Sequence, residues 1–130
     1  MPGQTQRMDR EAAVAAVRSF LRREEQLFAS RTAGRRALLR ALLPDLVGIL
    51  REAGATGIWV FGSLAASPGW SPAHPDSDLD LAATGLSLTA LLSVERRVRA
   101  LTVAPVDIVR MEDAASSLRE RVLADGEKMP

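Results

Sequence analysis

The chain has 130 residues, 47% of them hydrophobic and 25% charged, which is the length of one domain and the composition of a globular protein. Its 17 basic and 16 acidic residues leave a net charge of +1, so there is no general attraction to nucleic acid, and no apolar run is long enough to span a membrane. The chain has no cysteine and a single histidine, His74, which excludes thiolate and histidine-rich metal sites, agrees with a cytoplasmic protein, and restricts any metal to oxygen ligands.

The first part of the chain predicts a pair of N-terminal helices. Residues 1–8 contain no apolar segment, and we expect them to be flexible. Over residues 9–30, apolar side chains recur at steps of three, four and seven, which is typical of an amphipathic helix. We expect residues 31–34 to break this helix. A second helix then runs to Gly54, and Pro44 kinks it or divides it.

The rest of the chain alternates between strands and helices. Three short segments rich in apolar residues predict strands: residues 58–61, 78–84 and 106–110. Two helical patterns follow the second and third strands: residues 88–101 and 113–124. This order predicts an α+β fold in which a small mixed sheet has helices packed on one face, with a site on the other face or at its edge. We expect one domain over residues 9–130, with the helix pair over 9–54 and a core over 57–126.

Three aspartates lie inside segments that otherwise predict strands. Asp78 and Asp80 share one face of the second predicted strand, about 7 Å apart, and Asp107 lies in the third. Aspartate is depleted from strands because its side chain competes for backbone hydrogen bonds. A bound cation would explain all three, since Mg²⁺ prefers carboxylate oxygens and pairs of such ions support phosphoryl or nucleotidyl transfer. The alternative for Asp78 and Asp80 is a solvated strand start without a site.

A glycine–serine pair stands at the end of the first predicted strand. Gly62 and Ser63 would offer backbone N–H groups and a hydroxyl to a phosphate, with no side chain obstructing the approach. Taken alone, the pair is more typical of a plain turn or a helix cap. Its combination with the three aspartates is what favours phosphate binding.

These motifs together resemble a known family. The segments "FGS" after a strand, "SDLDL" on the next strand and "VDIV" on a later one are similar to the nucleotidyltransferase domain of the DNA polymerase β superfamily, above all its smallest branch, the minimal nucleotidyltransferases. The resemblance covers about residues 57–126. It implies a polymerase-β-like nucleotidyltransferase fold, extended in this chain by the N-terminal helix pair.

The resemblance also implies an activity. A nucleoside triphosphate would be held by Gly62 and Ser63, and two Mg²⁺ ions by Asp78 and Asp80, while Asp107 completes the metal site or helps to deprotonate the acceptor hydroxyl. Proteins of this branch act as antitoxins (MNT) beside a HEPN-type toxin, and some transfer AMP from ATP to a toxin tyrosine. The expectation is therefore Mg²⁺-dependent transfer of AMP from ATP to a hydroxyl of such a partner protein.

The loop between the two motifs differs from the family pattern. The family has a short turn with arginine and glycine, where this chain has Ala66 and Ser67, and the loop over residues 64–77 is longer. Two alternatives stay open: a catalytically weakened antitoxin that neutralises its partner by occlusion, and a transferase that acts on a small molecule. We interpret Trp70 as packing over the sheet edge and His74 as exposed, with base stacking and proton transfer as the respective alternatives.

The N-terminal helices are only partly covered by the resemblance. Their role is open between packing, assembly into a homo-oligomer and contact with a toxin. Within them, the Arg35–Arg36 pair is a candidate for contacting a partner or RNA.

Overall fold

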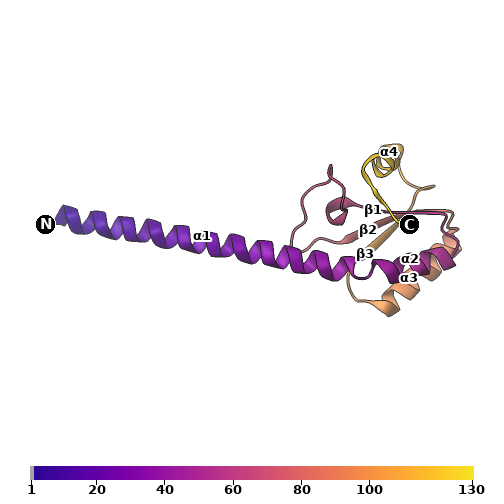
Figure 1. The fold of residues 1–130 in the computed structure, drawn as a ribbon, viewed down its shortest axis with the longest axis horizontal. Helices are drawn as coiled ribbons and strands as arrows, with labels where there is room; N and C mark the ends of the chain where they lie inside the picture. The colour runs from indigo at the N-terminus through magenta and orange to yellow at the C-terminus, as the bar shows by residue number, and fades with distance from the viewer. Residues whose placement is uncertain (1) are drawn as a thin grey trace.

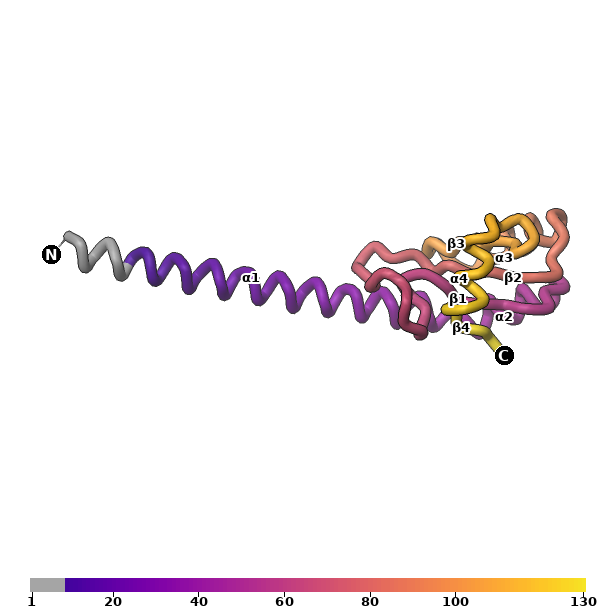
Figure 2. Tube along the Cα trace, turned by 90° about the horizontal axis from the view of Figure 1, so that it is seen from above, coloured from indigo at the N-terminus to yellow at the C-terminus, as the bar shows by residue number. Residues whose placement is uncertain are grey.

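The computed structural model describes the backbone of residues 2–130 and the side chains of residues 9–130. A small sheet with its covering helices occupies one end of the molecule, and the N-terminal part of the first helix extends away from it (Figures 1 and 2). The flexible N-terminus expected over residues 1–8 lies outside the residues described with side chains. Within the described part, none of the helices combines the length and the hydrophobicity that crossing a membrane requires.

Helix α1 (Pro2–Arg40) is a single helix of 39 residues. It runs without interruption through residues 31–34, so the predicted boundary between the first two helices was wrong. Gly34 lies there with open space around the position of an added Cβ, and a solvated glycine costs a helix only about 1 kcal/mol relative to alanine. The following Arg35 and Arg36 are good helix formers, and they continue the helix past the glycine.

Helix α2 (Leu43–Glu52) begins after a short turn at Ala41 and Leu42. Pro44 lies in its first turn, so of the two alternatives the proline divides the second predicted helix rather than kinking it. Proline suits that position because its missing N–H would have no intrahelical partner there. Leucines of α2 and the last buried leucine of α1 form one wall of the hydrophobic core: Leu43, Leu46 and Leu50 of α2, and Leu39 of α1.

Four strands form one mixed sheet in the order β3-β2-β1-β4. Their bounds are β1 (Gly57–Phe61), β2 (Leu79–Thr84), β3 (Val106–Arg110) and β4 (Glu127–Lys128). β1 and β2 are antiparallel, whereas β2 and β3 are parallel and are connected through helix α3 (Leu88–Leu101). The α+β class, the mixed sheet and all three predicted strands are confirmed. The two-residue strand β4 was not predicted, because so short a segment cannot show the alternation of apolar and polar residues that indicates a strand.

The two faces of the sheet are covered differently. Helices α2 and α3 cover one face, where they pack on inward-pointing strand residues: Ile58, Val60, Leu79, Leu81 and Ala83. The last helix, α4 (Ser116–Asp125), lies on the other face (Figure 1), where Val122 packs against Trp59, Ala82 and Met111. The helices expected on one face are thus α2 and α3. Helix α4 covers part of the opposite face, on which a site was predicted.

Candidate active site

The three predicted aspartates lie at one end of β2. Asp80 and Asp107 are register partners in the parallel ladder of β2 and β3, so their side chains emerge side by side. Asp80 follows the same alternation as Ala82, which places both carboxylates on the face that carries α4. Asp78 precedes the first residue of β2. The fold therefore places Asp80 and Asp107 side by side, with Asp78 just before the strand, and the chemical roles of all three stay predictions.

The carboxyl of Asp80 is electrostatically strained. Burial, followed in importance by the nearby negative charges of Asp107 and Asp78, raises its pKa to about 6. Asp78 itself has a positive neighbour, because Arg35 Nη2 lies 3.9 Å from its Oδ1. A cation bound beside Asp80 would relieve the repulsion between these carboxylates.

The donors present fit a hard divalent cation such as Mg²⁺, which takes carboxylate oxygens. Across the residues described with side chains, however, no three acidic or histidine groups gather closely enough to hold a metal ion. A cation at Asp80 and Asp107 would therefore need further ligands from substrate phosphates and water, as is usual for Mg²⁺ in phosphoryl-transfer sites. The arrangement suits a metal site that forms together with bound substrate.

Gly62 lies directly against the carboxylate of Asp80. It begins a short 3-10 helix, η1 (Gly62–Leu64), at the end of β1, and its φ of 75° is in the left-handed region. An added Cβ would lie 2.5 Å from Asp80 Oδ2, so the position excludes a side chain on both counts. The glycine of the first motif and the aspartate of the second, far apart in sequence, are thus neighbours.

Ser63 connects the first motif to the residue that precedes Asp78. Its hydroxyl donates a hydrogen bond to Ser77 Oγ at 3.0 Å, and Ser77 is almost fully buried. Ser77 Oγ also accepts from the His74 N–H at 2.9 Å, and the Ser77 carbonyl accepts from Arg35 Nε at 2.9 Å. The hydroxyl that the sequence assigned to a phosphate is therefore engaged within the protein in this structure.

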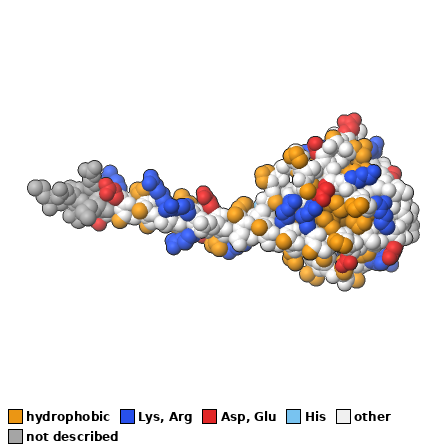
Figure 3. Space-filling model, in the orientation of Figure 1, with side chains coloured by type: hydrophobic (Ala, Val, Ile, Leu, Met, Phe, Trp, Pro, Cys, Tyr) orange, Lys and Arg blue, Asp and Glu red, His pale blue; other side chains and the backbone are white. Residues whose placement is uncertain are grey.

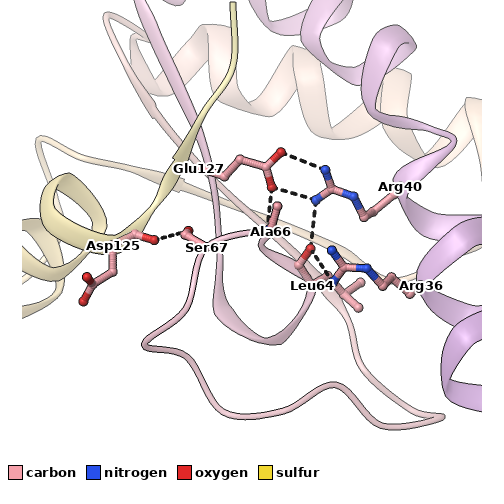
Figure 4. Close-up of polar contacts among 7 residues, drawn as sticks. All are labelled: Arg36, Arg40, Leu64, Ala66, Ser67, Asp125 and Glu127. Carbon is pink, nitrogen blue, oxygen red and sulfur yellow. Dashed lines mark hydrogen bonds and ion pairs between the residues drawn. The ribbon is translucent and has the colours of Figure 1, made fainter. Parts of the chain in front are cut away.

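Helix α1 brings arginines to the same turn, as Figure 4 shows. The Leu64 carbonyl accepts hydrogen bonds from Arg40 Nη1 at 2.9 Å and from Arg36 Nη1 at 3.4 Å. With Arg35 beside Asp78, three guanidinium groups lie near a site whose loop lacks the family arginine. This placement could not be predicted from the sequence, because it depends on how α1 packs on the loop.

A second network holds the start of the long loop (Figure 4). Glu127 in β4 accepts two hydrogen bonds of 2.7 Å from Arg40, and its Oε1 also accepts from the Ala66 N–H at 2.7 Å. Ser67 Oγ donates to the Asp125 carbonyl. The two positions that depart from the family motif, Ala66 and Ser67, are thus used to attach the loop to the C-terminal part of the chain.

Trp70 fixes the middle of the loop over the sheet. Its indole N–H donates to the Asp125 carbonyl at 2.9 Å, its ring lies 5.8 Å from that of Phe61, and the guanidinium of Arg121 lies 4.3 Å from the ring centroid. This agrees with the interpretation of Trp70 as a packing residue. His74 is exposed, as expected, and its Nδ1 accepts a hydrogen bond from the Asp76 N–H.

A cavity of about 630 Å³ opens beside Asp80 and Asp107 along the edge strand β3. Phe61 and Leu118 contribute apolar walls, and Glu95 and Arg99 of α3 add one charge of each sign. Its volume is in the range of small-molecule sites. Arg99 was not predicted as a site residue, because its spacing along the helix is that of an ordinary solvated face.

The Glu127–Arg40 pair should contribute measurably to stability. Both side chains are about three-quarters buried, and the hydrogen bond from Arg40 lowers the pKa of Glu127. Replacing Glu127 with glutamine should cost about 1–3 kcal/mol of unfolding free energy at pH 7. Because folding lowers the pKa of Glu127, this contribution is complete above the unfolded value of about 4.3 and is lost as the pH falls through the lower folded value. The cost should therefore vanish only well below pH 4.

Urea denaturation of the Glu127→Gln variant and the wild type at pH 7 and at about pH 2.5 tests this prediction. Glu120→Gln, which changes an exposed glutamate of α4, is the matched control and should have little effect at either pH. An equal loss of stability at both pH values would contradict the assigned role of the ion pair.

No family model and no curated protein matches the sequence. Among solved structures, a protein assigned as a minimal nucleotidyltransferase matches 74% of this chain and 95% of its own, at 29% identity and a TM-score of 0.57. The chain contains a minimal-nucleotidyltransferase-like domain. The resemblance found from "FGS", "SDLDL" and "VDIV" is thereby confirmed.

Two further structures share the fold of this nucleotidyltransferase-like domain. A chain of a toxin–antitoxin structure with AMP-PNP matches 65% of this chain and 69% of its own, at 21% identity and a TM-score of 0.51. A chain of the complex between a tri-AMPylated Shewanella oneidensis HEPN toxin and its MNT antitoxin matches 69% of this chain and 70% of its own, at 20% identity and a TM-score of 0.51.

Proposed function

We propose that this protein is a Mg²⁺-dependent nucleotidyltransferase that transfers AMP from ATP to a hydroxyl of a HEPN-type toxin and so acts as its antitoxin. The observation that carries the proposal is the position of Asp80, whose carboxylate lies beside Asp107 in the sheet and against Gly62 of the glycine–serine turn. A phosphate-binding turn and carboxylates for a cation would then meet at one point, beside a cavity large enough for part of a nucleotide.

The residues have distinct proposed roles in this reaction. The turn at Gly62 and Ser63 would bind the triphosphate through backbone N–H groups, and Asp78, Asp80 and Asp107 would hold the metal. Bound Mg²⁺ would supply neutralisation of phosphate charge and activation of the attacking oxygen. Asp107, which is exposed, would accept the proton of the acceptor hydroxyl as that oxygen forms its bond to the α-phosphorus and pyrophosphate leaves.

The arginines of α1 would take over part of the phosphate binding. Arg35 and Arg36 each donate a hydrogen bond to a backbone carbonyl, and Arg35 also makes a long contact with Asp78. Arg40, in contrast, is fixed in a bidentate pair with Glu127. A guanidinium exchanges a carbonyl for a phosphate readily, because the charged pair is the stronger hydrogen bond. Arg35 and Arg36 are therefore the proposed substitutes for the arginine that is absent at Ala66.

The choice of partner and nucleotide is supported by what the structures of similar fold contain. One is a toxin–antitoxin structure with AMP-PNP, an analogue of ATP, and another includes a tri-AMPylated HEPN toxin with its MNT antitoxin. These contents belong to those proteins, and they suggest the reaction to test in this one.

Incubation with labelled ATP, Mg²⁺ and a HEPN-type toxin encoded beside this protein tests the proposal directly. The wild type should label the toxin, and the Asp78→Asn plus Asp80→Asn double variant should not. Asp45→Asn, which changes an exposed aspartate of α2 far along the chain from the motifs, should label it as the wild type does. Equal labelling by the double variant would refute the assignment of these aspartates.

A second candidate is a non-catalytic antitoxin that blocks its partner by occlusion. It is favoured by the hydrogen bond between Ser63 and Ser77, which engages the motif hydroxyl, and by alanine at position 66. Co-expression separates the two candidates. If the double aspartate variant still protects cells from the toxin, occlusion suffices; if protection is lost while the two proteins still copurify, the chemistry is required.

A further inference from the structure

The N-terminal part of α1 lies outside the folded body of the protein. Every residue from 9 to 31 is exposed, and we call this stretch the arm. Figure 2 shows that it extends well beyond the sheet and its covering helices. Helices in proteins owe most of their stability to the packing of an apolar face rather than to helix propensity. The apolar face of the arm is therefore the feature to explain.

That face is a continuous stripe of large apolar side chains. Six of them are 44–57% exposed: Val14, Val17, Phe20, Leu21, Leu27 and Phe28. At the 100° turn of an α-helix they fall on one side of the arm, and Leu38, 62% exposed, continues the stripe beside the folded body. Figure 3 shows hydrophobic side chains along the arm between charged ones. An exposed stripe of this extent indicates an interaction surface.

Two opposite charges lie within the stripe at equal distances from its centre. Glu24 lies three residues before Leu27, and Arg31 lies three residues after Phe28. An axis between Leu27 and Phe28 that relates two antiparallel arms therefore places Glu24 of each copy opposite Arg31 of the other. A parallel pair of arms would instead set Glu24 against Glu24 and Arg31 against Arg31, which is repulsive.

Two further pairs of positions fit the same antiparallel register, which also sets Phe20 opposite Arg35. It places Val17 opposite Leu38 and Leu21 opposite Gly34, where the absence of a side chain leaves room for the leucine. The arm contains five arginines and four carboxylates, so its net charge is small and two arms repel each other only weakly. A hollow of about 400 Å³ between Leu27, Phe28 and Pro75 leaves space at the centre of the pairing.

We propose that two copies of this chain associate through antiparallel pairing of their arms, with the two-fold axis between Leu27 and Phe28. Such a pairing is self-complementary and closed, because each arm contributes the same surface. It buries the apolar stripe of both copies and places the two folded bodies at opposite ends of the paired arms. The proposal does not depend on the transfer reaction, and it is tested without it.

Two single-cysteine variants test the orientation of the arms, since the chain has no cysteine of its own. Phe28→Cys lies next to the proposed axis and should form a disulfide between copies under mild oxidation. Val14→Cys, at another exposed apolar position of the same arm, lies roughly 40 Å from its own counterpart in the antiparallel pair and should not. Equally efficient cross-linking of both variants would overturn the antiparallel arrangement.

Charge reversal tests the contacts that set the register. The wild type should have twice the chain mass of 14.0 kDa by light scattering. Glu24→Arg and Arg31→Glu should each weaken association by at least about tenfold, and the combined variant should restore it. Because both residues are exposed and lie outside the folded body, the melting temperature of the folded body should stay unchanged. The proposal is overturned if the wild type stays monomeric at high concentration, even if its arm binds another protein. It is also overturned if the combined variant does not recover association.

Discussion

Replacement of Asp80 with asparagine should abolish nucleotide transfer and at the same time stabilise the protein in the absence of substrate. The amide is nearly isosteric, so the fold should be kept, but it removes a negative charge that Asp107 and Asp78 oppose. Loss of a proposed metal ligand should reduce transfer by at least about a hundredfold, because even partners outside the coordination shell cost tenfold to a hundredfold. Opposite effects on activity and stability are expected of a site assembled for a cation.

The gain in stability should depend on pH with a definite sign. The pKa of Asp80 is about 6 in the folded protein and about 3.9 in an unfolded chain. Its favourable contribution is therefore complete below about pH 4 and is lost as the pH rises through 6. Because the group is half exposed, we expect about 1 kcal/mol of advantage for Asp80→Asn at pH 8 and almost none at pH 4.

Thermal denaturation across this range measures the effect, with and without Mg²⁺. At pH 8, Mg²⁺ should raise the melting temperature of the wild type and leave that of the Asp80→Asn variant unchanged. Asp45→Asn, which removes a charge from an exposed position of α2, is the control and should respond to Mg²⁺ as the wild type does. A variant that melts below the wild type at pH 8, or one that retains full transfer activity, would show that the carboxylates are structural.

Alanine in place of Gly62 should damage the same site through the backbone. The φ of 75° costs an alanine about 1–2 kcal/mol, and the new methyl would lie 2.5 Å from Asp80 Oδ2. Either the turn or the carboxylate has to move. We expect a loss of about 1–3 kcal/mol in unfolding free energy and of about a hundredfold in transfer, the size of effect that a displacement of 1 Å can produce.

Gly48→Ala provides the matched comparison. Gly48 lies inside α2 with open space around an added Cβ and with an ordinary φ, so alanine there should stabilise the protein by about 0.5–1 kcal/mol and leave transfer unchanged. Chemical denaturation and the labelling assay measure both variants. If Gly62→Ala proves as stable and as active as Gly48→Ala, the close approach of the turn to Asp80 has no functional role.

Local patterns predicted the sheet and the placement of the acidic residues. Asp80 and Asp107 were recognised because a charged residue in a short apolar strand is costly, and the register of β2 and β3 then places them side by side. Gly62 was recognised from its position after β1. Its contact with Asp80 could not be predicted, because it depends on the antiparallel pairing that sets Phe61 opposite Asp80.

What the sequence could not predict depends on packing between distant segments. Gly34 suggested a helix break, but a solvated glycine is a small cost against a helix that continues into a buried Leu39. The contacts of Arg36 and Arg40 with the Leu64 carbonyl follow from where α1 lies on the loop, and Glu127 belongs to a strand too short to show a pattern. Position 66 looked only like a missing arginine.

The hydrogen bond between Ser63 and Ser77 closes the base of the long loop. The two ends of the loop are therefore held together, one at the glycine–serine turn and the other next to Asp78. Loop length can then change by insertion or deletion without altering the distance between the two motifs. Its exposed stretch at Ser71 and Pro72 is accordingly the natural place to insert a reporter domain.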